Sequence, residues 1–432
     1  MLIRHLYLDR ISSYLDTPVV KVLTGVRRCG KSTILTMVRD LLLERGVRPE
    51  QIWIVTFESL AHEHLTDANS LYEEGLERAA QAEGKLYILL DEIQMVDRWE
   101  RVINSFRVDL DCDIIITGSN ASLLSGELAT FLTGRYVEFR IHPLSFSEYQ
   151  ELSFTTWISQ RRETARENKL LHPNEQSTTT EELTELWHAL HPQASLFNEF
   201  VRFGGLPGIH ELRGDADVQE QYLQDVLNSV LLKDVVSRFK IRDVNLLDRV
   251  LNFVVSNLGQ VITGKRIADY LKSQRRNVGV ETIYNYLDYL AQAFIIHKVS
   301  RYDITGKRIM ETHEKYFLED QGFATARLGY RPQEYPGLLE NIVYLELIRR
   351  GYDVHIGKQG NAEVDFIATM GSEKIYVQVS YLLVSPEVVE REFKPLREVK
   401  DHFRKIVLSL DDTENYTSAE GIERINVRKF LS

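Results

Sequence analysis

The chain has 432 residues, of which 44% are hydrophobic and 27% are charged, and its formal net charge is −11. This length is too great for one compact core and the composition is that of a folded protein, so a disordered chain is excluded and two or three domains are expected. The acidic balance argues against a protein coated with nucleic acid but is compatible with a local basic surface.

Cysteine content and apolar runs bear on the expected location. The cysteines are Cys29 and Cys112 alone, and so few thiols favour a reducing compartment over a disulfide framework. The N-terminal segment lacks the apolar core and cleavage site of a signal peptide, and no apolar run is long enough to cross a bilayer. We therefore expect a cytoplasmic protein with no membrane partner.

Up to about Pro143, short β-rich runs alternate with helical patterns, which predicts an α/β sheet built from crossover units. The expected strands begin at Val19, Ile52, Leu86 and Asp113. A helix is expected over residues 34–45, because apolar residues recur there at helical spacing and a glycine follows. From residue 144 to about 240 the pattern is helical throughout.

The segment GVRRCGKST fits G-x-x-x-x-G-K-[ST] and lies between the first expected strand and the first expected helix. Gly25 and Gly30 let the backbone curl so that its amides point at the phosphates of a nucleotide. Lys31 would bridge the β- and γ-phosphates, and Ser32 would place its hydroxyl on Mg²⁺. The expected ATP site is therefore Gly25, Val26, Arg27, Arg28, Cys29, Gly30, Lys31, Ser32 and Thr33. The alternative is a glycine-rich turn that contains Lys-Ser by coincidence.

A second motif, LYILLDE, agrees with the first. An apolar strand leads into Asp91 and Glu92. Asp91 suits Mg²⁺ coordination and Glu92 can polarise the attacking water as a general base. An acidic pair after a strand could also be a helix N-cap, but together with the first motif it favours ATP hydrolysis.

Two weaker candidates follow the strand that begins at Asp113. Ser119 or Asn120 could contact the γ-phosphate side of the site, although Gly-Ser-Asn is also an ordinary turn. Arg135 could stabilise charge in its own site or reach into a neighbouring subunit, and the alternative is a surface arginine.

A basic region lies between residues 264 and 310. Two helical patterns joined by a short polar turn, then a strand, a turn at Gly306 and another strand, predict a winged helix-turn-helix. From Lys265 to Met310 there are nine Lys or Arg and four Asp or Glu, a balance of +5, so the rest of the chain carries −16. Such a basic island on an acidic protein indicates nucleic-acid binding.

The basic side chains lie in the turn and the wing rather than in the second helix, and the expected DNA contacts are Arg275, Arg276, Lys307 and Arg308. This placement suits contacts with phosphates, which bind a duplex without reading its sequence. The alternative is a winged helix that only packs against the ATPase domain or a neighbouring subunit.

The last hundred residues resemble the PD-(D/E)xK nuclease core, in which carboxylates hold Mg²⁺ and a lysine acts on water. The polar residues in the matching order are Glu340, Glu363, Asp365, Gln378 and Ser380. Gln378 stands in place of an acidic residue and Ser380 in place of the lysine, so the core is expected to be inactive. Lys374 has the same strand parity and could substitute for the missing lysine.

The whole set of motifs resembles a bacterial and archaeal family of AAA-like ATPases. The matching pieces are TGVRRCGKSTIL, LLDEIQ, ITGSNASLL, TGRYVEF with HPLSFSEY, GGLP, KDVVSRFKIRD, GKRIADYL with TIYNYLDYL, SRYDITGKR, LLENIVYLEL, AEVDFI and IYVQVSYLL. The resemblance implies an ATPase domain, a helical lid, a winged helix and a degraded nuclease-like end domain.

The expected fold is α/β, with a P-loop ATPase core over residues 1–143, a helical lid over 144–240, a winged helix over 241–325 and a small restriction-endonuclease-like domain over 326–432. The expected function is hydrolysis of ATP with Mg²⁺, coupled to conformational change on DNA, by a homo-oligomer. Two alternatives remain open: a nucleotide-dependent switch that binds protein partners, and an ATP-driven structure-specific nuclease.

Overall fold

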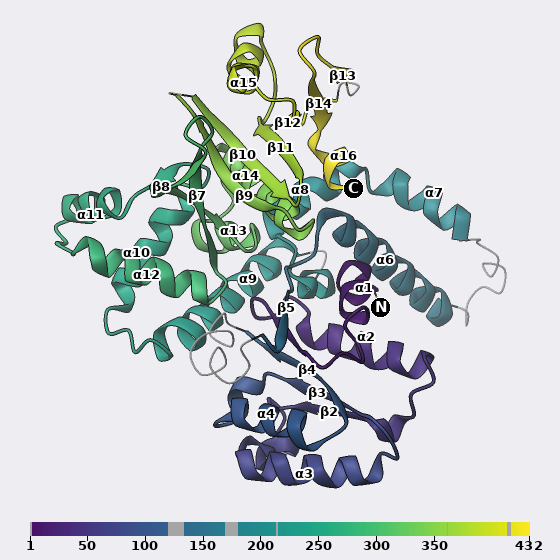
Figure 1. The fold of residues 1–432 in the computed structure, drawn as a ribbon. Helices are drawn as coiled ribbons and strands as arrows, with labels where there is room; N and C mark the ends of the chain where they lie inside the picture. Colours follow the sequence, from purple (N-terminus) through teal and green to yellow (C-terminus); the bar gives the residue numbers. More distant parts are fainter. Residues whose placement is uncertain (1, 120–133, 169–179, 213–214, 361, 413–415) are drawn as a thin grey trace. The chain divides into compact units, whose positions relative to one another are not determined.

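The computed structural model describes residues 2–119, 134–168, 180–212, 215–360, 362–412 and 416–432 (Figure 1). The chain divides into two compact units. Unit 1 comprises residues 1–143 and 292–294, and unit 2 comprises residues 144–291 and 295–432. Among the described residues, we find no helix with both the length and the apolar character needed to span a membrane.

Unit 1 is built on a parallel sheet. Its strands are β1 (Val20–Thr24), β2 (Ile52–Thr56), β3 (Leu86–Asp91), β4 (Cys112–Gly118) and β5 (Tyr136–Arg140). Its helices are α1 (His5–Ser12), α2 (Lys31–Glu44), α3 (Ala68–Gln81) and α4 (Trp99–Asp109), with short turns of 3₁₀ helix at Pro49–Gln51, Leu60–Thr66 and Ile93–Met95. The strand order is β2-β3-β4-β1-β5, and every neighbouring pair is parallel. The expected α/β sheet of crossover units is confirmed.

The core of unit 1 follows from the alternation of side chains along the strands. One face of the sheet packs against α3 and α4, which contribute Leu71, Ile103 and Phe106 to a buried cluster with Ile88 and Ile116. Helix α2 lies on the opposite side (Figure 1). Because β1, β3 and β4 are neighbours and parallel, their carboxyl ends meet at one edge, where ligands bind in open α/β sheets.

The first half of unit 2 is helical. Its elements are α6 (Phe146–Asn168), α7 (Thr180–Leu190), α8 (Gln193–Phe203), a 3₁₀ segment (Pro207–Leu212), α9 (Ala216–Val230), a π-helical turn (Leu231–Ser237) and α10 (Val244–Val255). Helices α11 (Gly264–Ser273) and α12 (Val280–Gln292) follow, joined by a short turn. The hydroxyl of Thr263 caps α11 by accepting from the amide of Arg266 at 3.1 Å.

The second half of unit 2 surrounds a mixed sheet. Its strands are β6 (Val261–Ile262), β7 (Ile296–Asp303), β8 (Arg308–Leu318), β9 (Asp353–Gln359), β10 (Ala362–Met370), β11 (Glu373–Val379), β12 (Arg404–Ser409), β13 (Tyr416–Thr417) and β14 (Ile422–Asn426). The remaining helices are α13 (Gly322–Leu328), a 3₁₀ turn (Pro332–Glu334), α14 (Tyr335–Arg349), α15 (Pro386–Glu398) and α16 (Val427–Leu431).

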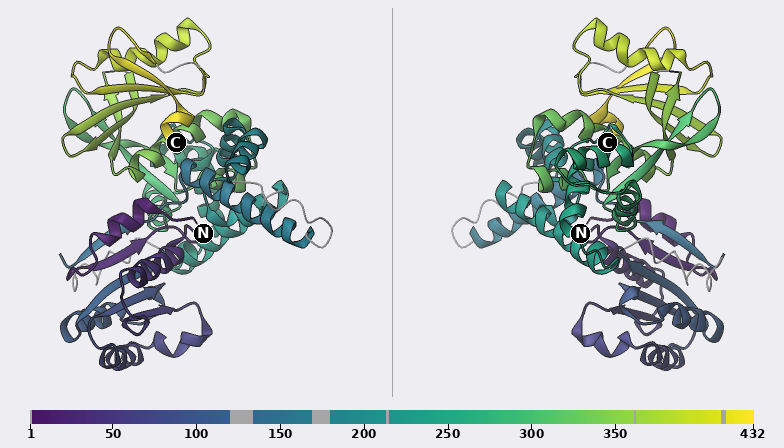
Figure 2. Two further views of the ribbon diagram at one scale, coloured as in Figure 1. Left: turned by 90° about the vertical axis from the view of Figure 1, so that its right-hand side faces the viewer. Right: turned by 90° about the vertical axis from the view of Figure 1, so that its left-hand side faces the viewer.

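The strands of unit 2 belong to one continuous sheet, in the order β13-β14-β12-β11-β10-β9-β7-β8-β6. β7 and β8 form an antiparallel hairpin, and β7 also pairs in parallel with β9, with Arg301 opposite Ile356 and Asp303 opposite Lys358. Figure 2 shows these strands from two further directions, coloured green to yellow. The hairpin that follows α12 and the strands after residue 350 are therefore parts of the same sheet.

The glycine pair of the GGLP segment is fixed by a buried carboxylate. Asp320 follows β8 and is fully buried. Its two oxygens accept hydrogen bonds from the amides of Gly205 and Gly322, each at 2.7 Å. A Cβ atom at Gly204 would lie 1.7 Å from Asp320 Oδ1, so only glycine fits there. Burial raises the pKa of Asp320 to about 7, although both amides act in the opposite direction.

Candidate functional site: a phosphate-binding loop and a second polar pocket

In the loop between β1 and α2, two positions have backbone angles suited to glycine, and one of them also has a close neighbour that only glycine tolerates. Gly25 has φ of 148° and Gly30 has φ of 104°, values that favour glycine. A Cβ atom at Gly25 would lie 2.2 Å from the carbonyl oxygen of Ile141. Gly30 is the N-cap of α2, so the loop leads its amides directly into the positive end of the helix.

Lys31 lies inside this loop and is only 4% exposed. Its ammonium donates to the carbonyl oxygens of Gly25 at 3.1 Å and Val26 at 3.2 Å. The same nitrogen is 3.6 Å from a carboxylate oxygen of Glu92. The loop thus gathers a lysine, a helix N-terminus and curled backbone in one place, which is a geometry suited to phosphate.

The acidic pair lies at the carboxyl end of β3 and is held by the neighbouring strand. The hydroxyl of Thr117 on β4 donates to Asp91 Oδ1 at 2.6 Å and accepts from the amide of Glu92 at 2.9 Å. Burial raises the pKa of Asp91, whereas the neighbouring hydroxyls of Thr117 and Ser32 lower it. Asp91 and Ser32 therefore lie together, and a carboxylate with a hydroxyl is a suitable ligand pair for Mg²⁺.

Glu92 adopts a left-handed backbone with φ of 58°, uncommon for a residue other than glycine. Its carboxylate accepts a hydrogen bond from the side-chain nitrogen Nε2 of Gln94, which also donates to the hydroxyl of Ser119 at 3.5 Å. Sequence reasoning missed Gln94 and Thr117. The signal for Thr117 was a threonine at the end of the strand DIIITG, where a polar residue interrupts an apolar run.

The other residues of the loop have separate surroundings. Arg27 forms an ion pair with Glu58 at 3.3 Å, and Arg28 has a positive φ of 66°. Cys29 is buried, and its carbonyl oxygen accepts from the guanidinium of Arg4 at 3.1 Å. Val26 is buried and Thr33 is exposed at the start of α2.

Arg4 is a further residue that the sequence did not reveal. Its side chain is 3% exposed and also donates to the carbonyl oxygens of His142 at 2.9 Å and Pro143 at 3.3 Å. Three backbone carbonyls thus share one guanidinium. Arg4 thereby ties the phosphate-binding loop to the segment after β5.

The remaining candidates of the N-terminal part lie after β4 and before β5. Asn120 lies outside the described residues. Ser119 is buried at the end of β4, on the same edge as Asp91. Arg135 is exposed immediately before β5, the strand next to β1.

The basic residues near the β7–β8 hairpin fall into two groups. Several are exposed and have no ion-pair partner within the part of the chain that the structure describes, namely Lys265, Lys272, Arg275, Lys307 and Arg308. Others are paired: Arg276 with Asp243 at 3.2 Å, Lys298 with Glu314 at 3.2 Å, and Arg301 with Glu363 at 3.2 Å. Of the four expected DNA contacts, only Arg276 is engaged by an acidic partner among the described residues.

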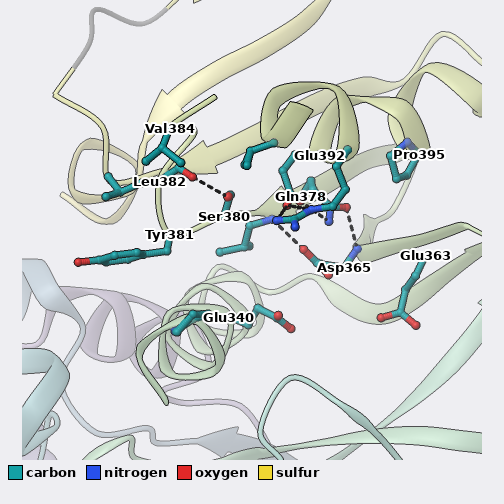
Figure 3. Close-up of a pocket in the computed structure, with 14 residues that line it drawn as sticks. Glu340, Glu363, Asp365, Gln378, Ser380, Tyr381, Leu382, Val384, Glu392 and Pro395 are labelled. Carbon is teal, nitrogen blue, oxygen red and sulfur yellow. Dashed lines mark hydrogen bonds and ion pairs between the residues drawn. The ribbon is translucent and has the colours of Figure 1, made fainter. Parts of the chain in front are cut away.

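Unit 2 also contains a polar pocket of about 710 Å³ between α14, β10, β11 and α15 (Figure 3). It brings together the residues that suggested a nuclease core: Glu340, Glu363, Asp365, Gln378 and Ser380. The Gln378 side chain accepts from the amide of Asp365 at 3.3 Å and donates to Glu392 at 3.1 Å. Ser380 donates to the carbonyl oxygen of Leu382 at 3.5 Å.

A lysine from the β7–β8 hairpin reaches the carboxylates of this pocket. Lys315 on β8 is 2% exposed, and its ammonium lies 3.2 Å from Glu340, 2.9 Å from Glu363 and 3.6 Å from Asp365. Burial alone would lower the pKa of Lys315, but the attraction of the three carboxylates raises it above its usual value, so the lysine is charged.

Burial, together with the neighbouring Asp365, raises the pKa of Glu340, and burial raises that of Asp365 as well. Lys374, the substitute suggested by strand parity, instead lies over the ring of Phe403 at 4.8 Å. The likeness of this region to a nuclease core stays a prediction.

Comparison with known families defines the class of the N-terminal part. Residues 17–150 match the AAA domain family, and residues 194–334 match a domain of unknown function (DUF8612). Unit 1 thus carries an AAA-type P-loop domain, as the motifs of the loop and of β3 predicted.

Two relatives cover nearly the whole chain. An uncharacterized protein of Haemophilus influenzae is 36% identical over 431 residues, which are 100% of this chain and 98% of the relative. Uncharacterized protein MJ1544 of Methanocaldococcus jannaschii is 31% identical over 94% of this chain and 84% of its own. The chain belongs to the family of these two proteins, which has bacterial and archaeal members.

Solved structures are more distant. The Walker-type ATPase paby2304 of Pyrococcus abyssi is 15% identical, with a TM-score of 0.47 over 76% of this chain and 96% of its own. The Orc1 protein of Aeropyrum pernix, solved in complex with DNA, is 14% identical, with a TM-score of 0.32 over 75% of this chain and 91% of its own.

Proposed function

We propose that this protein binds and hydrolyses ATP with Mg²⁺ at the edge of the unit 1 sheet, and that it couples hydrolysis to conformational change on DNA. The observation that carries the proposal is the convergence of four side chains at the carboxyl edge of the parallel sheet: Lys31 and Ser32 at the start of α2, and Asp91 and Glu92 at the end of β3. The match of this segment to the AAA domain family supports the same conclusion.

Each residue has a role that its position supports. The loop amides and Lys31 would hold the β- and γ-phosphates, and Ser32 with Asp91 would hold Mg²⁺, which neutralises charge on the phosphates. Glu92 would accept a proton from the attacking water. Its carboxylate lies 3.6 Å from the Lys31 ammonium, so the proposed base is next to the cation that would bind the phosphates.

The test separates binding from chemistry. Lys31→Ala removes an interaction with ground-state phosphate charge, so binding of a fluorescent ATP analogue should be abolished. Glu92→Gln removes the base but not the groups that hold phosphate, so binding should persist while kcat falls by about 10²- to 10⁴-fold. Hydrolysis by Glu92→Gln at the parental rate would show that another group acts as the base.

DNA binding is assigned to a winged helix formed by α11, α12 and the β7–β8 hairpin. Arg275 lies in the turn between the helices, and Lys307 and Arg308 lie at the tip of the hairpin; all three are exposed. Exposed cations on a turn and a wing are suited to phosphates rather than to base edges. We therefore propose binding without sequence preference.

Two quadruple variants with equal loss of charge test this assignment. The first replaces Arg275, Arg276, Lys307 and Arg308 with alanine. The control replaces four exposed lysines elsewhere in unit 2, at positions 233, 394, 400 and 429. Binding of two unrelated duplexes is measured by fluorescence anisotropy between 50 and 200 mM salt, a range over which about 10³- to 10⁵-fold decreases in affinity occur for proteins that bind many phosphates.

The first variant should weaken binding of both duplexes. The slope of log affinity against log salt should become shallower by about 0.9 for each phosphate that the variant no longer neutralises. The control should change neither quantity. Equal weakening in both variants would point to general charge, and a strong preference for one duplex would contradict binding through phosphates. Absence of DNA binding by the parent protein would favour the alternative, a nucleotide-dependent switch for protein partners.

A further inference from the structure

The carboxylates of the unit 2 pocket already have a cation. Lys315 lies within 3.6 Å of Glu340, Glu363 and Asp365, and its ammonium is almost fully shielded from water. The three acidic residues come from two elements, α14 and β10, whereas the lysine comes from β8. A single positive group at the centre of three carboxylates is the arrangement that a divalent ion would otherwise take.

We propose that Lys315 is the resident cation of this pocket, so that its ammonium and a divalent metal ion compete for the same carboxylates. The lysine contributes one charge where a metal ion would contribute two, and it cannot polarise a bound water as a metal does. The pocket is therefore a latent metal site, closed by a side chain of the hairpin.

The surrounding interactions favour a closed site. Glu363 is shared between Lys315 and Arg301, which gives this carboxylate two cationic partners. Asp365 accepts from the amide of Val379 at 2.8 Å with its other oxygen, which orients Oδ1 toward the lysine. Removing the lysine would leave Glu340 and Asp365 without the cation that they share, while Glu363 would keep Arg301; a pair of uncompensated carboxylates favours a hard divalent cation.

The experiment measures binding of Mn²⁺ to the full chain without nucleotide, by the decrease of the free-ion signal in electron paramagnetic resonance. Every protein in this test, the parent included, carries Asp91→Asn, so that the proposed Mg²⁺ site of unit 1 does not contribute. The variants are Lys315→Met, Asp365→Asn, the double variant, and Lys374→Met. The last removes a lysine of the same sheet that lies away from the carboxylates, and it is the matched control.

With Lys315 present, no stoichiometric Mn²⁺ binding is expected at pH 7.5. Lys315→Met should bind one Mn²⁺ per chain, with affinity at least about tenfold above the parent. This binding should vanish in the double variant and be absent from Lys374→Met. Mn²⁺ should also raise the melting temperature of Lys315→Met without changing that of the parent.

Two results would overturn the proposal. One is a parent protein that binds one Mn²⁺ in a manner abolished by Asp365→Asn. The other is a folded Lys315→Met chain, with parental circular dichroism, that binds none. If Lys315→Met does not fold, the variant that combines Lys315→Met with Glu363→Gln replaces it. This variant loses one positive and one negative group, so its net charge is that of the parent. It should bind one Mn²⁺ through Glu340 and Asp365. These outcomes are independent of ATP hydrolysis and DNA binding.

Discussion

At the scale of single residues, the candidate ATP site depends on a threonine that has no proposed contact with the nucleotide. Thr117 orients both members of the acidic pair, since its hydroxyl donates to Asp91 and accepts from the amide of Glu92. The two bonds fix the direction of the Asp91 carboxylate and the left-handed backbone of Glu92. Thr117 is thus a positioning residue for the proposed metal ligand and the proposed base.

Replacing Thr117 with valine keeps the shape of the side chain but removes both hydrogen bonds. We expect kcat to fall by about 10- to 100-fold, the usual cost of removing a residue that orients a metal ligand, while the affinity for ATP changes little. Thr117→Ser keeps the hydroxyl and should retain most activity. Steady-state hydrolysis with direct measurement of ATP binding separates the two effects; a serine variant as slow as the valine variant would assign the decrease to packing instead.

At the scale of elements, Asp320 links the end of β8 and the start of α13 to the loop after α8. It is a carboxylate without a cationic partner in hydrogen-bond contact among the described residues, held by the amides of Gly205 and Gly322. Because its pKa is raised to about 7, the folded chain keeps this proton over a range in which the unfolded chain has released it. The contribution of Asp320 to the free energy of unfolding should therefore decrease as pH rises from about 4 to about 7.

Asp320→Asn removes this titration. The quantity to follow is the free energy of unfolding of the parent minus that of the variant. This difference should fall between pH 5 and pH 7, by up to about 1.4 kcal/mol for each pH unit, and level off above pH 7. Urea unfolding at several pH values measures this difference, in which other titrating groups cancel. A difference that is constant with pH would show that Asp320 is ionised throughout. At pH 5 the variant should be less stable than the parent by about 1–3 kcal/mol, because one amide is left without its acceptor.

How far the sequence predicts such features depends on whether they are local. The phosphate-binding loop and the acidic pair could be predicted, because each is a short motif beside a strand. The sequence shows a polar residue at Thr117, but the partners of Thr117 and Arg4 could not be predicted, because strand order and the approach of distant segments set them. Lys315 shows this most clearly: β9 and β7 lie between β10 and β8 in the sheet, so no spacing indicates that it reaches Asp365.

At the scale of the whole molecule, the exposed Arg135 raises the question of assembly. It precedes β5, beside the strand that leads into the phosphate-binding loop, and it is exposed to solvent. An arginine in such a position can stabilise the charge of the transition state in a neighbouring subunit of a homo-oligomer. We predict that it acts across the subunit boundary.

Mixing two inactive proteins tests this prediction. Arg135→Ala subunits keep a complete nucleotide site, and Lys31→Ala subunits keep the arginine. Mixed assemblies should recover part of the parental ATPase activity, with a maximum at intermediate ratios. Arg135→Lys subunits are the control for the geometry of the guanidinium. Mixtures that assemble, as shown by light scattering, but never recover activity would indicate that Arg135 acts within its own subunit or not at all.

The pairing of β7 with β9 has a consequence for how this protein can change over generations. A boundary at residue 325 would cut through neighbours in one sheet, leaving each piece with a row of unpaired amides and carbonyls that recruits other chains. We therefore expect the hairpin and residues 326–432 to be inherited together. Recombination that exchanges only the hairpin, or only the strands that follow it, would have to preserve both the strand register and the ion pairs of Lys315. We therefore expect the hairpin and these strands to evolve as one unit.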